Sequence, residues 1–120
     1  MTKLTAREEE IMGYFWTNGE LFVKDILEMH PDPKPHFNTL STIVRGLESK
    51  GYLSYHTLGN THQYYALISE QEYGSRNLRS VVSKYFKNSA FNMVSSLVSE
   101  QEISLEELKE LIDIVKSQNK

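Results

Sequence analysis

The sequence predicts a mainly α-helical protein with one small two-stranded β-ribbon, followed by a C-terminal helical region. Three observations predict it. Capping signatures of the form Ser/Thr-x-x-Glu begin at Thr5, Ser69 and Ser104, and an apolar pattern with helical spacing follows each one. Gly59 and Asn60 separate two short segments that have the composition of strands. The 120 residues suffice for a packed core without disulfides.

The charge is unevenly distributed along the chain. A total of 13 Lys and Arg against 16 Asp and Glu gives a net charge of −3, which argues against general attraction to nucleic acid. Residues 33–99 nevertheless carry +4, whereas residues 1–32 carry −4 and residues 100–120 carry −3. This asymmetry suggests a polyanionic partner for the middle of the chain, and it also fits an ordinary dipolar surface.

Several classes of protein are excluded or disfavoured by composition. The chain has no cysteine, which excludes thiolate metal sites and cysteine nucleophiles. No apolar run approaches the ~18 residues of a membrane span, and the first ten residues are too charged for a signal sequence. We therefore expect a cytoplasmic protein without membrane insertion. Neither a glycine-rich phosphate loop nor a nucleophile elbow is present, so an enzyme is not expected.

The first two helices are predicted from the residues that begin and end them and from the helical spacing of their apolar residues. The pair Thr5 and Glu8 predicts a helix that begins at Ala6 and stops at Asn18 and Gly19. A shorter apolar pattern over residues 23–29 predicts a second helix. Three prolines within residues 31–35 must end it, because proline lacks the backbone N–H and restricts the residue before it.

The segment 38–50 predicts a helix with two different faces. Its buried stripe consists of Leu40, Ile43, Val44 and Leu47. Its opposite face consists of Asn38, Thr42, Arg45 and Ser49. That outer face carries no carboxylate, and its side chains can donate to phosphates or base edges. Gly51 suits the left-handed position that ends such a helix.

A hairpin follows, with strands over residues 53–58 and 61–67. A two-residue turn at Gly59 and Asn60 would pair positions whose numbers sum to 119, so that Tyr55 faces Tyr64. The same register places His56 and His62 on opposite faces of the ribbon, so they cannot share a metal ion. We expect Trp16, Tyr55 and Tyr64 to belong to the core, and no cofactor or metal site.

Three helices followed by a two-stranded ribbon are typical of a winged helix-turn-helix domain, in which the third helix enters the major groove and the ribbon, or wing, contacts the DNA backbone. We predict this domain over residues 1–68. The candidate DNA-binding residues are Asn38, Thr39, Ser41, Thr42, Arg45 and Ser49 on the helix, Lys34 and His36 before it, and Asn60 and His62 on the wing. Arg45 would either read a guanine or pair with a phosphate. Thr39 would contact a phosphate or serve only as a helix cap.

The remaining chain, residues 69–120, predicts a helical dimerisation region. Its apolar stripes need a partner, since the winged helix already has a core, and a second copy is the simplest partner. The candidate dimerisation residues are Val82, Tyr85, Phe86, Phe91, Val94, Leu97, Leu105, Leu108, Leu111, Ile112 and Val115.

The order and spacing of several segments resemble the penicillinase repressor (BlaI/MecI/CopY-type) family of bacterial transcriptional repressors. The matching residues are Leu4–Thr5 with Glu9–Met12 and Trp16, Thr39 followed by Thr42, Leu47, Lys50 and Gly51, then Gln63–Tyr65, Phe91–Asn92, and Leu105–Leu111. The resemblance implies a homodimer that binds double-stranded DNA at an inverted-repeat operator. It also implies release from DNA through a regulatory protease or membrane sensor.

Three positions depart from the family pattern. Gly46 replaces the arginine that many members carry before the leucine matched by Leu47. The C-terminal cysteines of copper-responsive members are absent. The Asn-Phe cleavage pair of the β-lactam-responsive members is matched by Leu97 and Val98. The operator sequence and the input signal are therefore expected to differ.

Two other functions fit the same residues. One is a winged-helix regulator switched by a small ligand in a cleft between the two regions, which would show a ligand-dependent melting temperature. The other is a winged helix that binds a protein partner through its glutamate-rich ends.

Overall fold

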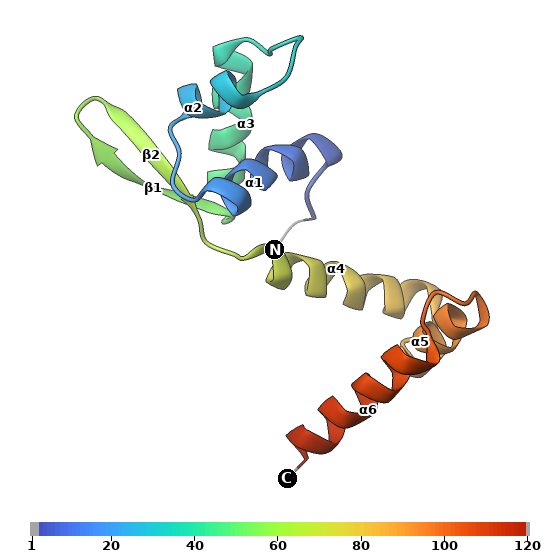
Figure 1. Cartoon of the computed structure of the whole chain (residues 1–120). Coiled ribbons are helices and arrows are strands. Elements are labelled where there is room, and N and C mark those ends of the chain that lie inside the picture. The colour runs from blue at the N-terminus through green and yellow to red at the C-terminus, as the bar shows by residue number, and fades with distance from the viewer. Residues whose placement is uncertain (1–2, 120) are drawn as a thin grey trace. The chain divides into compact units, whose positions relative to one another are not determined.

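A computed structural model describes residues 3–119, which form six helices and one two-stranded antiparallel sheet (Figure 1). The elements in chain order are α1 (Ala6–Asn18), α2 (Val23–Met29), α3 (Phe37–Ser49), β1 (Leu53–Leu58), β2 (Thr61–Ala66), α4 (Glu70–Tyr85), α5 (Ala90–Ser99) and α6 (Leu105–Gln118). The predicted fold class is confirmed. None of the helices in the described part of the chain is long and apolar enough to cross a membrane.

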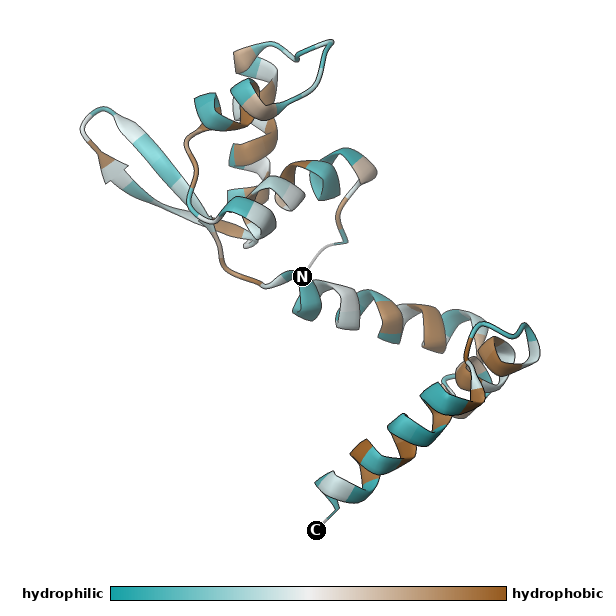
Figure 2. Cartoon of the chain, viewed as in Figure 1, coloured by the Kyte–Doolittle hydropathy of each residue, from teal (hydrophilic) through white to brown (hydrophobic). Residues whose placement is uncertain are grey.

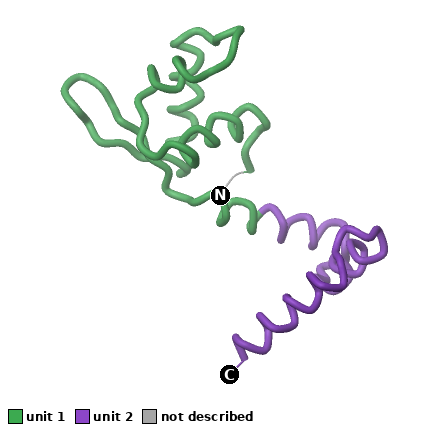
Figure 3. The backbone as a smooth tube through the Cα atoms, in the orientation of Figure 1, with its two compact units in different colours: residues 1–76 green, residues 77–120 purple. Residues whose placement is uncertain are grey.

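The chain forms two compact units, residues 1–76 and residues 77–120 (Figure 3). Helix α4 begins in the first unit and ends in the second. Its first turns belong to the first unit because Tyr73 is buried there, with its ring centroid 5.7 Å from that of Trp16 and 5.8 Å from that of Tyr52. The hydroxyl oxygen of Tyr73 also accepts a hydrogen bond of 3.2 Å from the backbone N–H of Leu4.

The first unit has a single apolar core between α1, α2, α3 and the ribbon. The residues that form it are Leu4, Ile11, Met12, Phe15, Leu21, Ile26, Leu40, Val44, Leu47, Tyr52, Leu53, Tyr64, Ile68 and Tyr73. Each fully buried aliphatic side chain among them stabilises the fold by about 1.5 to 3 kcal/mol. The predicted stripe of α3 is buried except for Ile43, which is half-buried and packs at the edge of the core.

The helix ends agree with the predicted capping. At α1, the Glu8 N–H donates to Thr5 Oγ1 at 3.2 Å and the Thr5 N–H donates to Glu8 Oε1 at 2.9 Å. Ser69 and Ser104 form the same reciprocal boxes. Gly51 has φ 87°, and at this C-terminus its N–H donates to the Glu48 carbonyl. The left-handed residue thus satisfies a carbonyl that the helix leaves unpaired.

The ribbon has the predicted register. Tyr55 pairs with Tyr64, and Gly59 has φ 62°, as the first turn position of a II′ hairpin requires. Strand β2 ends at Ala66, one residue before the prediction. The Leu67 N–H still donates to the carbonyl of Tyr52, its partner in the register, at 2.8 Å, but the Tyr52 N–H donates to the Leu47 carbonyl at 3.0 Å, so the reciprocal ladder bond is not formed.

An additional bridge, which the sequence did not indicate, attaches the ribbon to the connection between α1 and α2. Leu21 and Tyr64 exchange two backbone hydrogen bonds of 2.9 and 2.8 Å. They form an antiparallel bridge beside β2. The wing is therefore held by its base to the helical part of the first unit.

The second unit consists of the end of α4 with α5 and α6. Helices α4 and α6 begin where their capping signatures place them. Helix α4 ends at Tyr85, so that the predicted stripe residue Phe86 lies one residue beyond the helix. None of residues 77–119 is fully buried. Figure 2 shows that apolar positions nevertheless recur along α5 and α6.

Candidate nucleic-acid interface

The outer face of α3 is exposed and free of carboxylates. Asn38, Thr42, Arg45 and Ser49 are all exposed on it, as is Thr39 in its first turn. Thr42 Oγ1 donates a hydrogen bond of 2.9 Å to the Asn38 carbonyl, and Arg45 Nη2 lies 3.4 Å from Thr42 Oγ1. The guanidinium is therefore held along the helix face while its other donors stay available to a ligand.

A hollow of about 410 Å³ lies between α2, α3 and the wing. The residues that line it are Phe22, Val23, Lys24, Phe37, Ser41, Arg45, Asn60, Thr61, His62 and Tyr64. Four of the predicted DNA-binding residues meet here: Ser41, Arg45, Asn60 and His62. The first two come from α3 and the other two come from the wing, so the fold brings together two elements that the sequence places about 15 to 20 positions apart.

The charge around the hollow suits an anion. Lys24 and Arg45 are cationic, and no carboxylate is among the lining residues. Lys24 Nζ lies 5.8 Å from the centroid of the Phe22 ring, which is cation–π contact. Burial raises the pKa of the Tyr64 phenol, so this group stays neutral and adds no negative charge to the lining.

The histidines of the wing occupy opposite faces, as the register predicted. The His62 ring stacks on the Tyr55 ring with centroids 3.9 Å apart. The His56 ring stacks on Tyr65 at 4.7 Å, and His56 Nε2 lies 3.5 Å from Glu20 Oε1. Among the described residues no group of three or more His, Cys, Asp or Glu side chains is placed to hold a metal ion.

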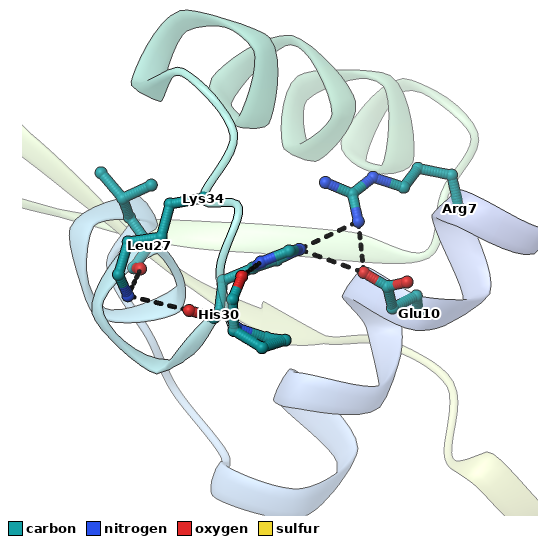
Figure 4. Close-up of polar contacts among 6 residues, drawn as sticks. Arg7, Glu10, Leu27, His30 and Lys34 are labelled. Carbon is teal, nitrogen blue, oxygen red and sulfur yellow. Dashed lines mark hydrogen bonds and ion pairs between the residues drawn. The ribbon is translucent and has the colours of Figure 1, made fainter.

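Lys34 occupies a different position from the other predicted DNA contacts. Its Nζ donates to the carbonyls of Leu27, Glu28 and His30 at 2.9, 2.9 and 2.8 Å. These carbonyls lie at the C-terminal end of α2, where a cation also interacts favourably with the helix dipole (Figure 4). The ammonium has three donors and all three are used here, so a phosphate would have to compete with the end of α2.

A polar cluster joins the end of α2 to α1 (Figure 4). His30 Nδ1 lies 2.7 Å from the Pro31 carbonyl, and its Nε2 lies 3.0 Å from Arg7 Nη1 and 3.3 Å from Glu10 Oε1. Arg7 and Glu10 also pair with each other. These contacts give His30 a structural role.

The remaining predicted residues are spread over the first unit. His36 is the N-cap residue of α3 and makes no side-chain capping bond there. Ser49 is the last residue of α3, at the opposite end from Phe37. Sequence reasoning missed Lys24 and Phe37, which share the hollow with Arg45. Lys24 lies within residues 1–32, whose net charge is −4, and only the exposure of Phe37 at a helix start distinguishes it from a core residue.

The three helices and the ribbon, with an exposed polar face on the third helix, define a winged helix-turn-helix protein with a C-terminal helical region. Residues 4–117 match the family described as Penicillinase repressor, and the chain therefore belongs to the penicillinase repressor family. This is a family of transcriptional repressors, and the predicted resemblance is confirmed.

Two relatives illustrate how much of the chain this similarity covers. The methicillin resistance regulatory protein MecI of Staphylococcus aureus strain N315 is 24% identical over 116 residues, which cover 94% of this chain and 93% of the relative. The penicillinase repressor of Bacillus licheniformis is 23% identical over 114 residues, which cover 94% of this chain and 89% of the relative. The similarity therefore includes both compact units.

Proposed function

We propose that the chain is a homodimeric transcriptional repressor that binds an inverted-repeat operator, in the cytoplasm where bacterial DNA lies. The outer face of α3 carries this proposal: it is exposed, polar and free of carboxylates, and Arg45 lies at its centre. In this mechanism α3 enters the major groove and the wing contacts the neighbouring backbone. The protein represses by occupying DNA that the polymerase needs.

The dimer part of the proposal is supported by the second unit. Exposed large apolar side chains recur in it, among them Phe91, Val98, Leu105, Leu111, Ile112 and Val115. An apolar surface of this kind on a small protein marks an interface. A second copy fits it best because self-association also supplies the second half of an inverted repeat.

Dimerisation would couple the two half-sites. Once one α3 is bound, the tether holds the second one near its own half-site, about 34–36 Å away for sites one helical turn apart. The effective concentration of the second domain is then high, and affinity exceeds that of one domain alone. A protease or sensor that separates the C-terminal helices would remove this advantage and release the DNA. The matched pair Leu97 and Val98 lies within α5.

The test is fluorescence anisotropy on DNA from upstream of the protein's own gene, with scrambled DNA as the control and a series of salt concentrations. We expect a clear preference for the upstream DNA and an affinity that falls steeply as the salt concentration rises, because Lys and Arg side chains that bind phosphates release counterions from the DNA. If the protein shows no preference for the upstream DNA, the titration is repeated with duplexes selected from genomic DNA. Equal and weak binding to all of these duplexes would overturn the proposal.

A further inference from the structure

Phe37 lies exposed at the start of the proposed recognition helix. It is the first residue of α3, and the residue is 49% exposed. It is neither in the core nor among the half-buried residues packed against the core. About half of this large apolar ring stays exposed, and together with Phe22 and Tyr64 it forms an apolar lining of the hollow, which suggests a contact with a ligand.

The surroundings of Phe37 indicate what kind of ligand fits. The ring borders the hollow of about 410 Å³, whose aromatic residues also include Phe22 and Tyr64. Lys24 and Arg45 lie in the same lining, which contains no carboxylate. An apolar surface flanked by cations complements a nucleotide, which offers anionic phosphate oxygens together with an apolar sugar and base surface.

The chemistry of Phe37 indicates which of the four bases it contacts. Residues at the N-terminal end of a recognition helix contact base edges in the major groove. A phenyl ring has no hydrogen-bonding group, so against guanine, adenine or cytosine it would leave a donor or acceptor desolvated and unpaired. Thymine alone presents a methyl group in the major groove, and apolar side chains contact that methyl group favourably.

We infer that Phe37 is a specificity-determining residue that packs on the methyl group of a thymine in each half-site, while a neighbouring phosphate lies beside Lys24. The inference rests on the proposed function, since it requires α3 to enter the major groove. The inference specifies one base of each operator half-site. It also assigns two DNA contacts, Phe37 and Lys24, that the helical periodicity of α3 did not indicate.

The experiment replaces thymine by deoxyuridine in a duplex that the wild-type protein binds, one symmetric pair of positions at a time. Deoxyuridine lacks only the methyl group. Loss of one buried methyl contact weakens binding about fourfold, so two half-sites together give about 15-fold. We expect a loss of this size at one pair of positions near the N-terminus of α3. For Phe37→Ala, the thymine and deoxyuridine duplexes should bind equally well.

The control variant is Leu67→Ala. Leu67 is 54% exposed, close to the value for Phe37, and it lies in the first unit outside the hollow. This variant should keep the full difference between thymine and deoxyuridine. Phe37→Leu keeps an apolar contact and should retain part of the difference.

Two outcomes would overturn the inference. In the first, no pair of deoxyuridine replacements weakens binding by the wild-type protein. This result does not depend on whether any variant folds. In the second, Phe37→Ala retains the full preference for thymine, which would leave the hollow to another occupant such as an amphipathic small anion. Both are read on a duplex that the wild-type protein binds specifically, so they stay distinct from failure of the proposed repressor function.

Discussion

Arg45 has a testable role because two modes of contact with DNA predict different results. We expect Arg45→Ala to weaken operator binding while the dimer stays intact, since the side chain is exposed and supports no core residue. A bidentate guanine contact is worth about 1 to 3 kcal/mol, and its loss would relax the preference at one base pair. A phosphate contact would instead weaken binding to all sequences alike and reduce the salt dependence by about one counterion per subunit.

The measurement is anisotropy titration on the operator and on duplexes altered at single positions, with light scattering to check the dimer. Arg79→Ala serves as the control, because Arg79 is also an exposed arginine but lies outside the hollow and outside the proposed DNA-binding and dimerisation residues. Unchanged operator affinity for Arg45→Ala would remove Arg45 from the site.

Two glycines should respond oppositely to alanine. A Cβ atom added at Gly46, inside α3, would meet nothing within 4 Å. We expect Gly46→Ala to stabilise the protein by about 1 kcal/mol, since alanine is the better helix former. Gly19 has φ 82° and ψ −135°, a conformation that is nearly exclusive to glycine. Gly19→Ala should therefore destabilise the protein by about 1 to 3 kcal/mol.

Thermal unfolding followed by circular dichroism tests both variants, at equal protein concentrations because dimerisation would make Tm depend on concentration. A shift of about 4 to 8 °C per kcal/mol is expected for a domain of this size. If Gly46→Ala melted lower than the wild type, the space around residue 46 would be occupied in solution, contrary to the structure.

At the scale of elements, an ion pair holds the start of α1 to the end of α3. Lys50 Nζ lies 2.8 Å from Glu8 Oε1 and 2.7 Å from Oε2, and the Glu8 side chain is only 13% exposed. Burial by itself raises the pKa of the Glu8 carboxyl. Hydrogen bonds from Lys50 and Thr5, with the positive charge of Lys50, outweigh burial and hold that pKa below its usual range.

This ion pair predicts how stability depends on pH. A carboxyl with a lowered pKa in the folded state stabilises the protein above its unfolded pKa of about 4.3, and that contribution is lost as pH falls through the folded value. Glu8→Gln keeps an acceptor for the Thr5 cap but removes the charge. We expect a loss of about 1 to 3 kcal/mol at pH 7, which shrinks as pH falls from about 5 to 3.

Denaturant unfolding at several pH values measures this difference. Glu9→Gln changes an exposed carboxylate of the same turn and is the control. A difference between Glu8→Gln and the wild type that stays constant down to pH 3 would show that the charge of Glu8 contributes nothing.

For the whole molecule, the main prediction concerns assembly. Leu108 and Ile112 lie on the apolar stripe of α6, half-buried and 53% exposed respectively. Glutamates at both positions would place charge in the proposed interface, where desolvation is costly. We expect the double variant to scatter light as a monomer of 13.9 kDa and the wild type to scatter as twice that mass.

Glu110→Lys changes the charge of α6 on the side opposite the stripe, where Glu110 is exposed, and should leave the dimer intact. The same double variant should bind the operator weakly, because it loses the second half-site contact. A dimer that persists in the double variant would place the interface on a different surface of the chain.

Local signals in the sequence were sufficient for the elements themselves. Each capping box lies within four residues, and Gly59 with Asn60 determined the ribbon register, because these hydrogen bonds form between neighbours in the chain. The apolar stripe of α3 likewise predicted its buried face, apart from the half-buried Ile43. Family membership followed from the order of such segments, since the match spans residues 4–117.

The composition of the candidate site depended on contacts between distant parts of the chain. Periodicity states which face of a helix is buried, but it does not state which surfaces of other elements lie beside the exposed face. Only the packing of α2 and the wing against α3 joins Lys24, Phe37 and His62 in one hollow. Lys34 is a local exception, because its ammonium donates to carbonyls only four to seven residues earlier in the chain, at the end of α2, which helical periodicity did not indicate. The elements follow from short-range hydrogen bonding and hydrophobic spacing, whereas the site follows from long-range packing.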